Sequence, residues 1–332
     1  MRWMLCLRKP SVEAEIIAAM LFLILIPLLA HALSGGAPGY RIVYTTKGED
    51  GFWHLFTINP DGTDKKQITH GSFHDIAPVW APDCSHILFL STRAGVTNEI
   101  FSLDIKRGIF ENLTNSPNIL ESGFDISPDG RKLVFSAGGK LYILDLSTGA
   151  RRLISNDLGP MDSDFSPRWS PDGRHIAFVR ALGGVNFEIF IRDADGGEAV
   201  RLTNTPAPAA ECCIAFSPDG RRIFFSSNRL RGFYDLFALD LETKKEKRIP
   251  VPNPKLSVKV GDVSPEGDEI VFEGFDTERR RNSIYVMNLK SGELRKLDDV
   301  WYFSHPRWSP APLRMGLSLR WMPALWGVLK RR

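Results

Sequence analysis

Apolar and polar residues alternate along most of this chain, in short runs separated by turn residues. The stretch that begins at Ser163 is typical: FSPRWS, HIAFVR, FEIFIRD and AVRLTN follow one another, and all are rich in Phe, Ile, Val, Trp or Leu. A period of two is that of a half-buried β-strand, and no segment of this array keeps a helical period over a useful length. The pattern predicts an all-β protein.

Turn residues join these strands into units of four. Ser-Pro-Asp-Gly connects the first strand to the second: proline presets φ, Asp hydrogen-bonds the local backbone, and Gly accepts a positive φ. A second turn with Gly connects the third strand to the fourth, as in LDLSTGARRLI at 144–154. Cys84 takes the Gly place in one first turn, where a positive φ would cost about 1 kcal/mol. The Asp of these turns, Asp219 for example, is expected to bend the chain and not to catalyse.

The same phrase recurs along the chain, so the unit is a structural repeat. Its anchor prolines are spaced by 43 to 47 residues. Four antiparallel strands at this period predict the blades of a β-propeller, each covered by its neighbours. The anchor prolines are Pro82, Pro128, Pro171, Pro218, Pro265 and Pro310.

The strand count predicts a closed ring of six blades. The array begins with a second strand, RIVYTT at 41–46, and ends with a first strand, SHPRWS at 304–309. The last strand is expected to complete the blade that the other three strands open, which leaves no exposed sheet edge. Residues 40–310 are therefore assigned to a six-bladed β-propeller of four-stranded antiparallel blades, closed by the C-terminal strand.

The N-terminus has the composition of an export signal. Basic residues precede an apolar run from Ile16 to Leu33, and Ala30-His31-Ala32 offers a small-x-small cleavage site. Residues 1–32 are expected to be a signal peptide or, alternatively, an uncleaved membrane anchor, with 33–39 as a linker. Either interpretation places the propeller outside the cytoplasm, in the periplasm or another extracytoplasmic space.

The tail at 311–332 is basic and apolar, with five positive charges and no acidic residue. This composition suits a membrane surface or a groove on a partner; an extension without regular structure or an added edge strand is the alternative.

Charge and motifs exclude several function classes. Residues 33–310 carry 34 basic and 37 acidic side chains, so the body has no bulk electrostatic reason to bind nucleic acid. The sequence has no Gly-x-Ser-x-Gly elbow, phosphate-binding loop or dinucleotide fingerprint. No catalytic residue and no cofactor are expected.

A family resemblance adds to this reading. Over residues 40–310 the chain resembles the TolB-type propeller repeat, also called the WD-like Pro-Asp repeat. The resemblance rests on LTN or a similar triplet before PxWSPDG, followed by IxFxSxR and a third strand such as EIFSLD. The resemblance implies an exported six-bladed propeller that binds proteins of the cell envelope. TolB itself carries an α/β domain before its propeller, and residues 33–39 offer no counterpart. A TolB-like repeat protein is expected, with a place in a Tol-Pal-type system left open.

Candidate binding residues lie on the face that carries the second-to-third and fourth-to-first loops, here named the loop face; the hairpins lie on the opposite hairpin face. Seven residues before the anchor proline, four of the six blades have a carboxylate. These four would form an acidic ring at the channel mouth that holds a cation or a basic segment of a partner; alternatively, each caps its own loop. They are Asp75, Glu121, Asp164 and Glu211.

Arginines with neighbouring aromatics stand farther out in the second-to-third loops. This composition is typical of binding hot spots, although charged loop tips are common to soluble propellers, and the hairpin face is the other candidate surface. The residues are Arg93, Arg180, Arg229, Arg231, Phe233, Arg279, Arg280 and Arg281.

The remaining metal-ligand residue types give weaker signals. His70, His74 and Asp75 are close in sequence but lie in an expected loop, where a spacing of four has no special meaning. Cys212 and Cys213 are adjacent on an expected inner strand, so their side chains should point to opposite faces and bind no common ion. The rival to a protein-binding scaffold is a lyase or hydrolase that acts on envelope polysaccharide or peptide and uses some of the four carboxylates at the channel mouth.

Overall fold

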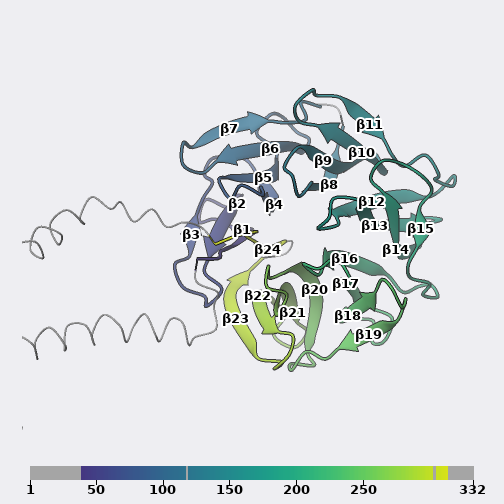
Figure 1. Ribbon diagram of the computed structural model, residues 1–332. Helices are drawn as coiled ribbons and strands as arrows, with labels where there is room; N and C mark the ends of the chain where they lie inside the picture. The colour runs from purple at the N-terminus through teal and green to yellow at the C-terminus, as the bar shows by residue number, and fades with distance from the viewer. Residues whose placement is uncertain (1–38, 117–118, 302–303, 313–332) are drawn as a thin grey trace, which may run out of the picture. The chain divides into compact units, whose positions relative to one another are not determined.

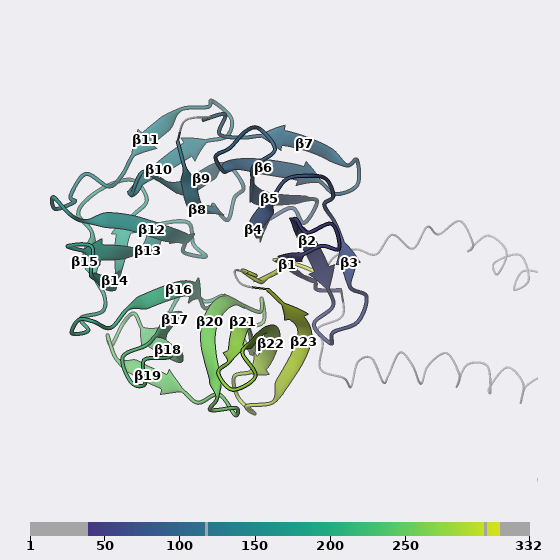
Figure 2. The ribbon, with the colours of Figure 1, turned by 180° about the vertical axis from the view of Figure 1, so that it is seen from behind.

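The computed structural model describes residues 39–116, 119–301 and 304–312. Within these ranges, six four-stranded antiparallel sheets are arranged as blades around a centre, and β4, β8, β12, β16, β20 and β24 are the innermost strands (Figure 1). Figure 2 shows the same ring from behind. The six-bladed, all-β prediction is confirmed.

The blades follow the chain in order after the first. Blade 1 contains β24 (Arg307–Trp308), β1 (Ile42–Lys47), β2 (Trp53–Ile58) and β3 (Lys66–Gln67). Blade 2 contains β4 (Asp75–Trp80), β5 (His86–Ser91), β6 (Glu99–Asp104) and β7 (Ile109–Asn112). Blade 3 contains β8 (Glu121–Ile126), β9 (Lys132–Ala137), β10 (Lys140–Asp145) and β11 (Arg151–Leu153).

The second half repeats this order with longer strands in places. Blade 4 contains β12 (Ser163–Trp169), β13 (His175–Leu182), β14 (Asn186–Asp193) and β15 (Val200–Arg201). Blade 5 contains β16 (Glu211–Phe216), β17 (Arg222–Ser227), β18 (Asp235–Asp240) and β19 (Glu246–Ile249). Blade 6 contains β20 (Leu256–Val263), β21 (Glu269–Asp276), β22 (Arg281–Asn288) and β23 (Leu294–Val300).

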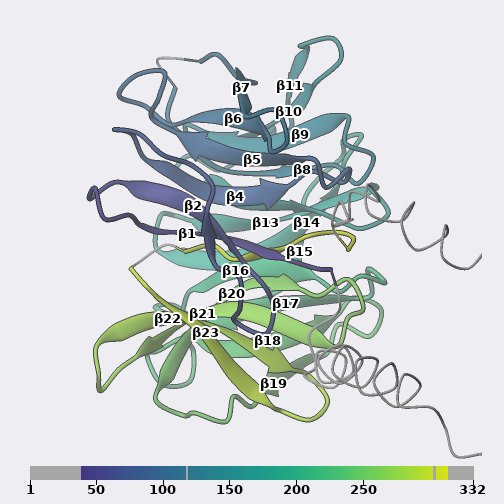
Figure 3. The same ribbon diagram turned by 90° about the vertical axis from the view of Figure 1, so that its left-hand side faces the viewer.

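The C-terminal strand closes the ring as predicted. Strand β24 pairs antiparallel with β1, with Trp308 opposite Ile42, and Figure 3 shows this yellow segment beside the purple β1. The N–H of Ser309 donates to the carbonyl of Arg41 at 2.7 Å, and the N–H of Arg41 donates to the Ser309 hydroxyl at 3.0 Å. These bonds join the two ends of the domain.

Apolar side chains fill the spaces between blades. Each of the six hydrophobic clusters draws on two neighbouring blades; Val134 and Leu141 of blade 3, for instance, pack with Trp169 and Phe178 of blade 4. Each blade also places an aromatic of its second strand opposite one of its third, a pairing that adds stability beyond area burial. These pairs are Tyr44–Phe56, Phe89–Phe101, Phe135–Tyr142, Phe178–Phe190, Phe225–Phe237 and Phe272–Tyr285.

The Ser-Pro-Asp-Gly turns have a structural role. The carboxylate of Asp219 accepts the Ser217 hydroxyl at 2.6 Å and the N–H of Arg221 at 3.0 Å, and these bonds lower its pKa. Gly220 has φ +68, and a Cβ there would lie 3.7 Å from Pro171 of the preceding blade. The turn therefore both bends the chain and contacts the preceding blade. Cys84 has φ +56, as its place in the repeat predicts.

The Thr or Ser that follows the fourth strand also has a repeated role. Its hydroxyl accepts the N–H of a third-strand residue fourteen positions earlier in the same blade. This bond explains why LTN and related triplets recur. The residues are Thr69, Thr114, Ser155 and Thr203.

A bulge interrupts most of the first strands. Five residues before the anchor proline, several blades have a non-glycine residue with positive φ. A bulge changes which side chains face each side of a strand, so it decides what the innermost strand presents to the channel. The residues are Ala77, Ser166, Cys213 and His305.

The expected signal or anchor at 1–32, nearly all of the linker and the tail from 313 lie outside the described residues. The ranges that the structure describes contain no helix long and apolar enough to cross a membrane.

Candidate functional site

The four carboxylates of the expected acidic ring are fully buried. Asp75 accepts the Ser91 hydroxyl at 2.6 Å and a nitrogen of Arg93 at 2.8 Å. Glu211 is bonded in the same way, by the Ser227 hydroxyl at 2.8 Å and by Arg229 at 2.8 Å. Each carboxylate therefore has its own set of partners at the edge of a blade.

The other two carboxylates vary this arrangement. Asp164 pairs with Arg180 at 2.7 Å, and the Ser155 hydroxyl donates to it at 2.6 Å. Glu121 accepts the hydroxyls of Thr114 and Ser116, both at 2.9 Å, and among the described residues no arginine or lysine forms an ion pair with it. Burial raises the pKa of Glu121 in spite of these bonds, and it raises the pKa of Glu211 in spite of Arg229.

Three of the predicted loop arginines belong to these buried pairs. Arg229 lies over the rings of Phe225 and Phe237, at 5.6 and 4.7 Å, while it binds Glu211. Arg93 and Arg180 lie over the matching rings of blades 2 and 4. A guanidinium that is bonded to a buried carboxylate and packed on an aromatic pair is fixed within the blade, and it has little freedom to bind a partner.

The remaining predicted residues lie nearer the surface. Arg231 is exposed but pairs with Asp235 at 2.8 Å. Arg279, Arg280 and Arg281 are exposed, and so is Phe233, at 47%. These four residues are the part of the predicted site that is available at the surface.

Exposed apolar side chains concentrate on the loop face. Among the described residues, eight of the thirteen large hydrophobic side chains that are exposed lie in second-to-third or fourth-to-first loops; the other five lie on outer strands or hairpins. Exposed apolar groups are common at interaction surfaces, so this distribution makes the loop face the candidate interaction surface. The eight are Val96, Ile119, Leu120, Met161, Val185, Leu230, Phe233 and Trp301.

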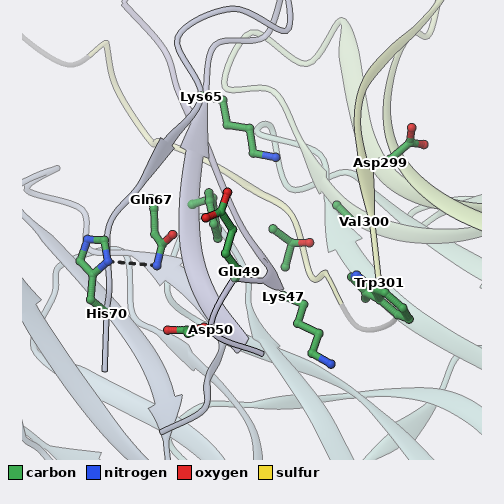
Figure 4. A pocket seen from close by; sticks show the side chains of 12 residues that line it. Lys47, Glu49, Asp50, Lys65, Gln67, His70, Asp299, Val300 and Trp301 are labelled. Carbon is green, nitrogen blue, oxygen red and sulfur yellow. Dashed lines mark hydrogen bonds between the residues drawn. The ribbon is translucent and has the colours of Figure 1, made fainter. Parts of the chain in front are cut away.

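A groove on this face adjoins the last of these residues. It has a volume of 570 Å³ and lies between blade 1 and the end of β23 (Figure 4). The ammonium group of Lys47 lies 5.4 Å from the centre of the Trp301 ring, and His70 hydrogen-bonds Gln67 at 3.0 Å. The groove therefore combines an exposed tryptophan, a residue type enriched in binding hot spots, with charged side chains.

The side chains of His70, His74 and Asp75 each bond a different partner, so they do not form a common metal site. His70 bonds Gln67, the ring Nδ1 of His74 accepts the N–H of Trp53 at 3.3 Å, and Asp75 pairs with Arg93. In the part of the chain that the structure describes, no three His, Cys, Asp or Glu residues are placed to hold one ion.

The central channel contains charged residues that the sequence reasoning missed. A cavity of 410 Å³ is lined by all six anchor prolines, so it lies at the mouth on the hairpin face. The residue three positions before each proline also lines it, and the same repeat alignment would have identified these positions. They are Val79, Asp125, Arg168, Ala215, Asp262 and Arg307.

Acidic and basic residues follow one another around this ring. The carboxylate of Asp125 accepts the N–H of Trp169 at 2.9 Å, and that of Asp262 accepts the N–H of Trp308 at 3.1 Å. Arg307 lies 3.7 Å from Asp125. Burial raises the pKa of Asp125 to about 6 and that of Asp262 to about 7, although the charge of Arg168 lowers both.

Three indole side chains also line the cavity. They belong to Trp80, Trp169 and Trp308, and their Nε1 atoms are buried and meet no acceptor among the described residues. The charged groups that line the cavity are therefore two carboxylates and two guanidinium groups, set among prolines and indole rings.

The adjacent cysteines do not point to opposite faces, so that prediction is wrong. Their sulfur atoms lie 3.0 Å apart. The cause is the bulge of β16: Cys213 has φ +57, which turns its side chain toward that of Cys212.

The fold and the repeated turns define a six-bladed propeller of Pro-Asp repeats. Comparison of this chain with known protein families and structures agrees with that class. The family model of the TolB beta propeller domain matches residues 125–315, more than half of the chain. The chain therefore belongs to this family, which confirms the resemblance to TolB-like propellers.

Individual relatives are similar over much of this chain. It is 28% identical to the Tol-Pal system protein TolB of Francisella tularensis subsp. tularensis, over 62% of this chain and 60% of that protein. It is 26% identical to dipeptidyl-peptidase 5 of Porphyromonas gingivalis, over 73% of this chain and 43% of that protein. The chain thus spans less than two thirds of the length of either relative.

A solved structure supports the fold. The crystal structure of TolB from Acinetobacter baumannii matches with a TM-score of 0.68 and 22% identity, over 85% of this chain and 70% of that one.

Proposed function

We propose that this protein is an exported propeller that binds protein partners of the cell envelope through its loop face. The observation that carries the proposal is the gathering of exposed apolar side chains on that face, beside the groove of Trp301 and the exposed arginines at 279–281. Apolar anchors surrounded by charge are typical of protein interfaces.

The family supports an envelope location and a protein partner. The relative from Francisella tularensis is a Tol-Pal system protein, and residues 1–32 of this chain have the composition expected of a signal or anchor. The terminal segments, 1–32 and 311–332, add a proposed contact with the membrane. The four buried carboxylates are not proposed to hold a cation, because hydrogen bonds and arginines already occupy them.

Two matched variants test the choice of face. Leu230 on the loop face and Val200 on an outer strand are both 58% exposed. Leu230→Asp in the full chain should lose at least about tenfold in affinity for partners captured from envelope extract, as expected for an interface anchor, whereas Val200→Asp should retain them. Equal capture by both variants would place the interface elsewhere.

The arginine run provides a second test of the same face. Changing Arg279, Arg280 and Arg281 to Glu reverses exposed charges, so folding should be unchanged. The expected result is slower association with the captured partner and a weaker dependence on salt, measured by surface plasmon resonance. Unchanged kinetics would remove this segment from the interface.

A channel enzyme is the second candidate. It is favoured by Asp125 and Asp262, two carboxylates of raised pKa in a polar cavity beside Arg168 and Arg307, since such groups are common in active sites. Similarity to a dipeptidyl-peptidase suggests chromogenic dipeptide substrates as a first assay. Turnover by the natural chain that Asp125→Asn and Asp262→Asn both abolish would support this candidate; turnover that persists in them, or none at all, would count against it.

A further inference from the structure

The adjacent cysteines of β16 have a geometry that the proposed binding function does not use. Both are half-buried, and Cys213 packs against the apolar cluster between blades 5 and 6. The bulge brings their sulfurs to 3.0 Å, close enough for reaction with each other. Cys84 lies on a hairpin of blade 2 and forms no disulfide.

The hydrogen bond between the two sulfurs distinguishes the two thiols. The pKa of Cys213 is lowered, first by this bond with Cys212 and then by the positive charges of Lys259 and Arg168, although burial and the charge of Glu273 act in the opposite direction. The pKa of Cys212 is raised, first by the same bond and then by burial, although the hydroxyl of Tyr234 bonds it. Cys213 is therefore the thiol that ionises first and the better nucleophile.

We propose that Cys212 and Cys213 form a reversible dithiol–disulfide couple. The Cys213 thiolate attacks a low-molecular-weight disulfide of the glutathione class, which forms a mixed disulfide and releases one thiolate. Cys212 then loses its proton to water, and its sulfur attacks the sulfur of Cys213 and releases the second thiolate. Two protein thiols are oxidised while one external disulfide is reduced to two thiols.

The backbone makes this disulfide easy to reduce. Adjacent α-carbons are about 3.8 Å apart across a trans peptide, whereas most disulfides join α-carbons at about 4.4 to 6.8 Å. A bond between neighbours is therefore strained, and strained disulfides have the more oxidising potentials of labile or regulatory ones. Closing it removes the Cys213 thiolate and fixes the bulge beside blade 6.

The test uses the full chain with Cys6→Ser and Cys84→Ser, so that only the pair remains. The folded protein is treated with oxidised glutathione, then unfolded and alkylated. Mass spectrometry then gives the mass of the peptide that contains residues 212 and 213. The expected product carries no alkyl group, is lighter by two hydrogens, and returns to the dithiol with dithiothreitol. Alkylation of both cysteines, or attachment of two glutathiones, would overturn the proposal.

Single variants test the order of reaction. Cys212→Ser should stop at a stable mixed disulfide on Cys213, whereas Cys213→Ser should react more slowly, since burial raises the pKa of its remaining thiol even without the bond from Cys213. In urea this difference should disappear, because burial and the surrounding charges act only in the folded state. Equal rates for the two folded variants would contradict the assignment of Cys213 as the nucleophile.

Discussion

Residues of the same chemical type have different roles at different repeat positions. The carboxylates seven positions before the anchor proline are buried and bonded within the blades, whereas Asp125 and Asp262, three positions before it, line the channel. Spacing from the proline therefore identifies a structural position in the blade. The type of residue at that position then sets its chemistry.

Removing the arginine of a buried ion pair should lower the stability of the folded protein. Arg229→Ala leaves the Glu211 carboxylate buried without its cation, so the free energy of unfolding should fall by about 3–5 kcal/mol. Urea denaturation measures this. Arg279→Ala is the control, since that side chain is 82% exposed and should change stability by less than about 0.5 kcal/mol. Adding Glu211→Gln should recover part of the loss; no recovery would show that Arg229 acts through packing alone.

The channel carboxylates predict a dependence of stability on pH. The folded-state pKa of Asp262 is about 7, above its ordinary value of 3.8, so the folded protein binds more protons than the unfolded chain between these values. Stability should fall as pH rises from about 4 to 7 and stay low above it, by a few kcal/mol for this group.

Asp262→Asn isolates that contribution. The variant should be more stable than the natural protein at pH 8 and similar to it at pH 4, because only ionisation of the buried carboxylate differs. Thermal unfolding at both pH values provides the measurement. Parallel curves for the two proteins would show that Asp262 does not titrate with a raised pKa.

Elements repeat because each one meets the same neighbours in every blade. The Ser-Pro-Asp-Gly hairpin and the aromatic pair of the second and third strands were readable from residues such as Gly220 and Phe225, since turn chemistry and strand period are local. The bulges at Ser166 and Cys213 could not be predicted from the sequence, because neither residue is a glycine and nothing else in the sequence indicates a positive φ there.

The one irregular hairpin offers a stabilising change. Cys84 has φ +56, whereas the equivalent Gly130, Gly173, Gly220 and Gly267 have φ between +68 and +79. Cys84→Gly should relieve about 1 kcal/mol of backbone strain, partly offset by the greater freedom of glycine in the unfolded chain. A rise in the melting temperature is expected. The matched change Ser85→Gly should lower it, and a fall with Cys84→Gly would indicate that the contact of Cys84 with Ala311 matters more.

The whole molecule depends on closure of the ring. Two hydrogen bonds and the pairing of β24 with β1 join residues that are far apart in sequence, and Trp308 packs in the cluster between blades 6 and 1. Closure therefore connects the stability of the first blade to the C-terminal strand. It also removes the unpaired edge that an open array would expose.

A pair of tryptophans tests this closure. Trp308 is 3% exposed and Trp301 is 60% exposed. Trp308→Ala should lower the free energy of unfolding by about 3–5 kcal/mol, because it leaves a cavity at the joint, whereas Trp301→Ala should change it by less than about 0.5 kcal/mol. Guanidinium unfolding followed by circular dichroism gives both values. Similar losses for the two variants would show that β24 contributes little to the closed ring.

The sequence by itself determined the period, the strand type, the turn chemistry and the number of blades, because each depends on contacts between residues near in the chain. It also predicted ring closure, since the array starts and ends at complementary strands. Only the tertiary structure decided which charges meet. Arg229 contacts Glu211 and Phe237 from a different strand, and Arg307 approaches Asp125 from another blade. The contact between the sulfurs of Cys212 and Cys213 also depends on the tertiary structure. The positive φ of Cys213 turns its side chain toward Cys212, whereas the strand pattern implied side chains on opposite faces.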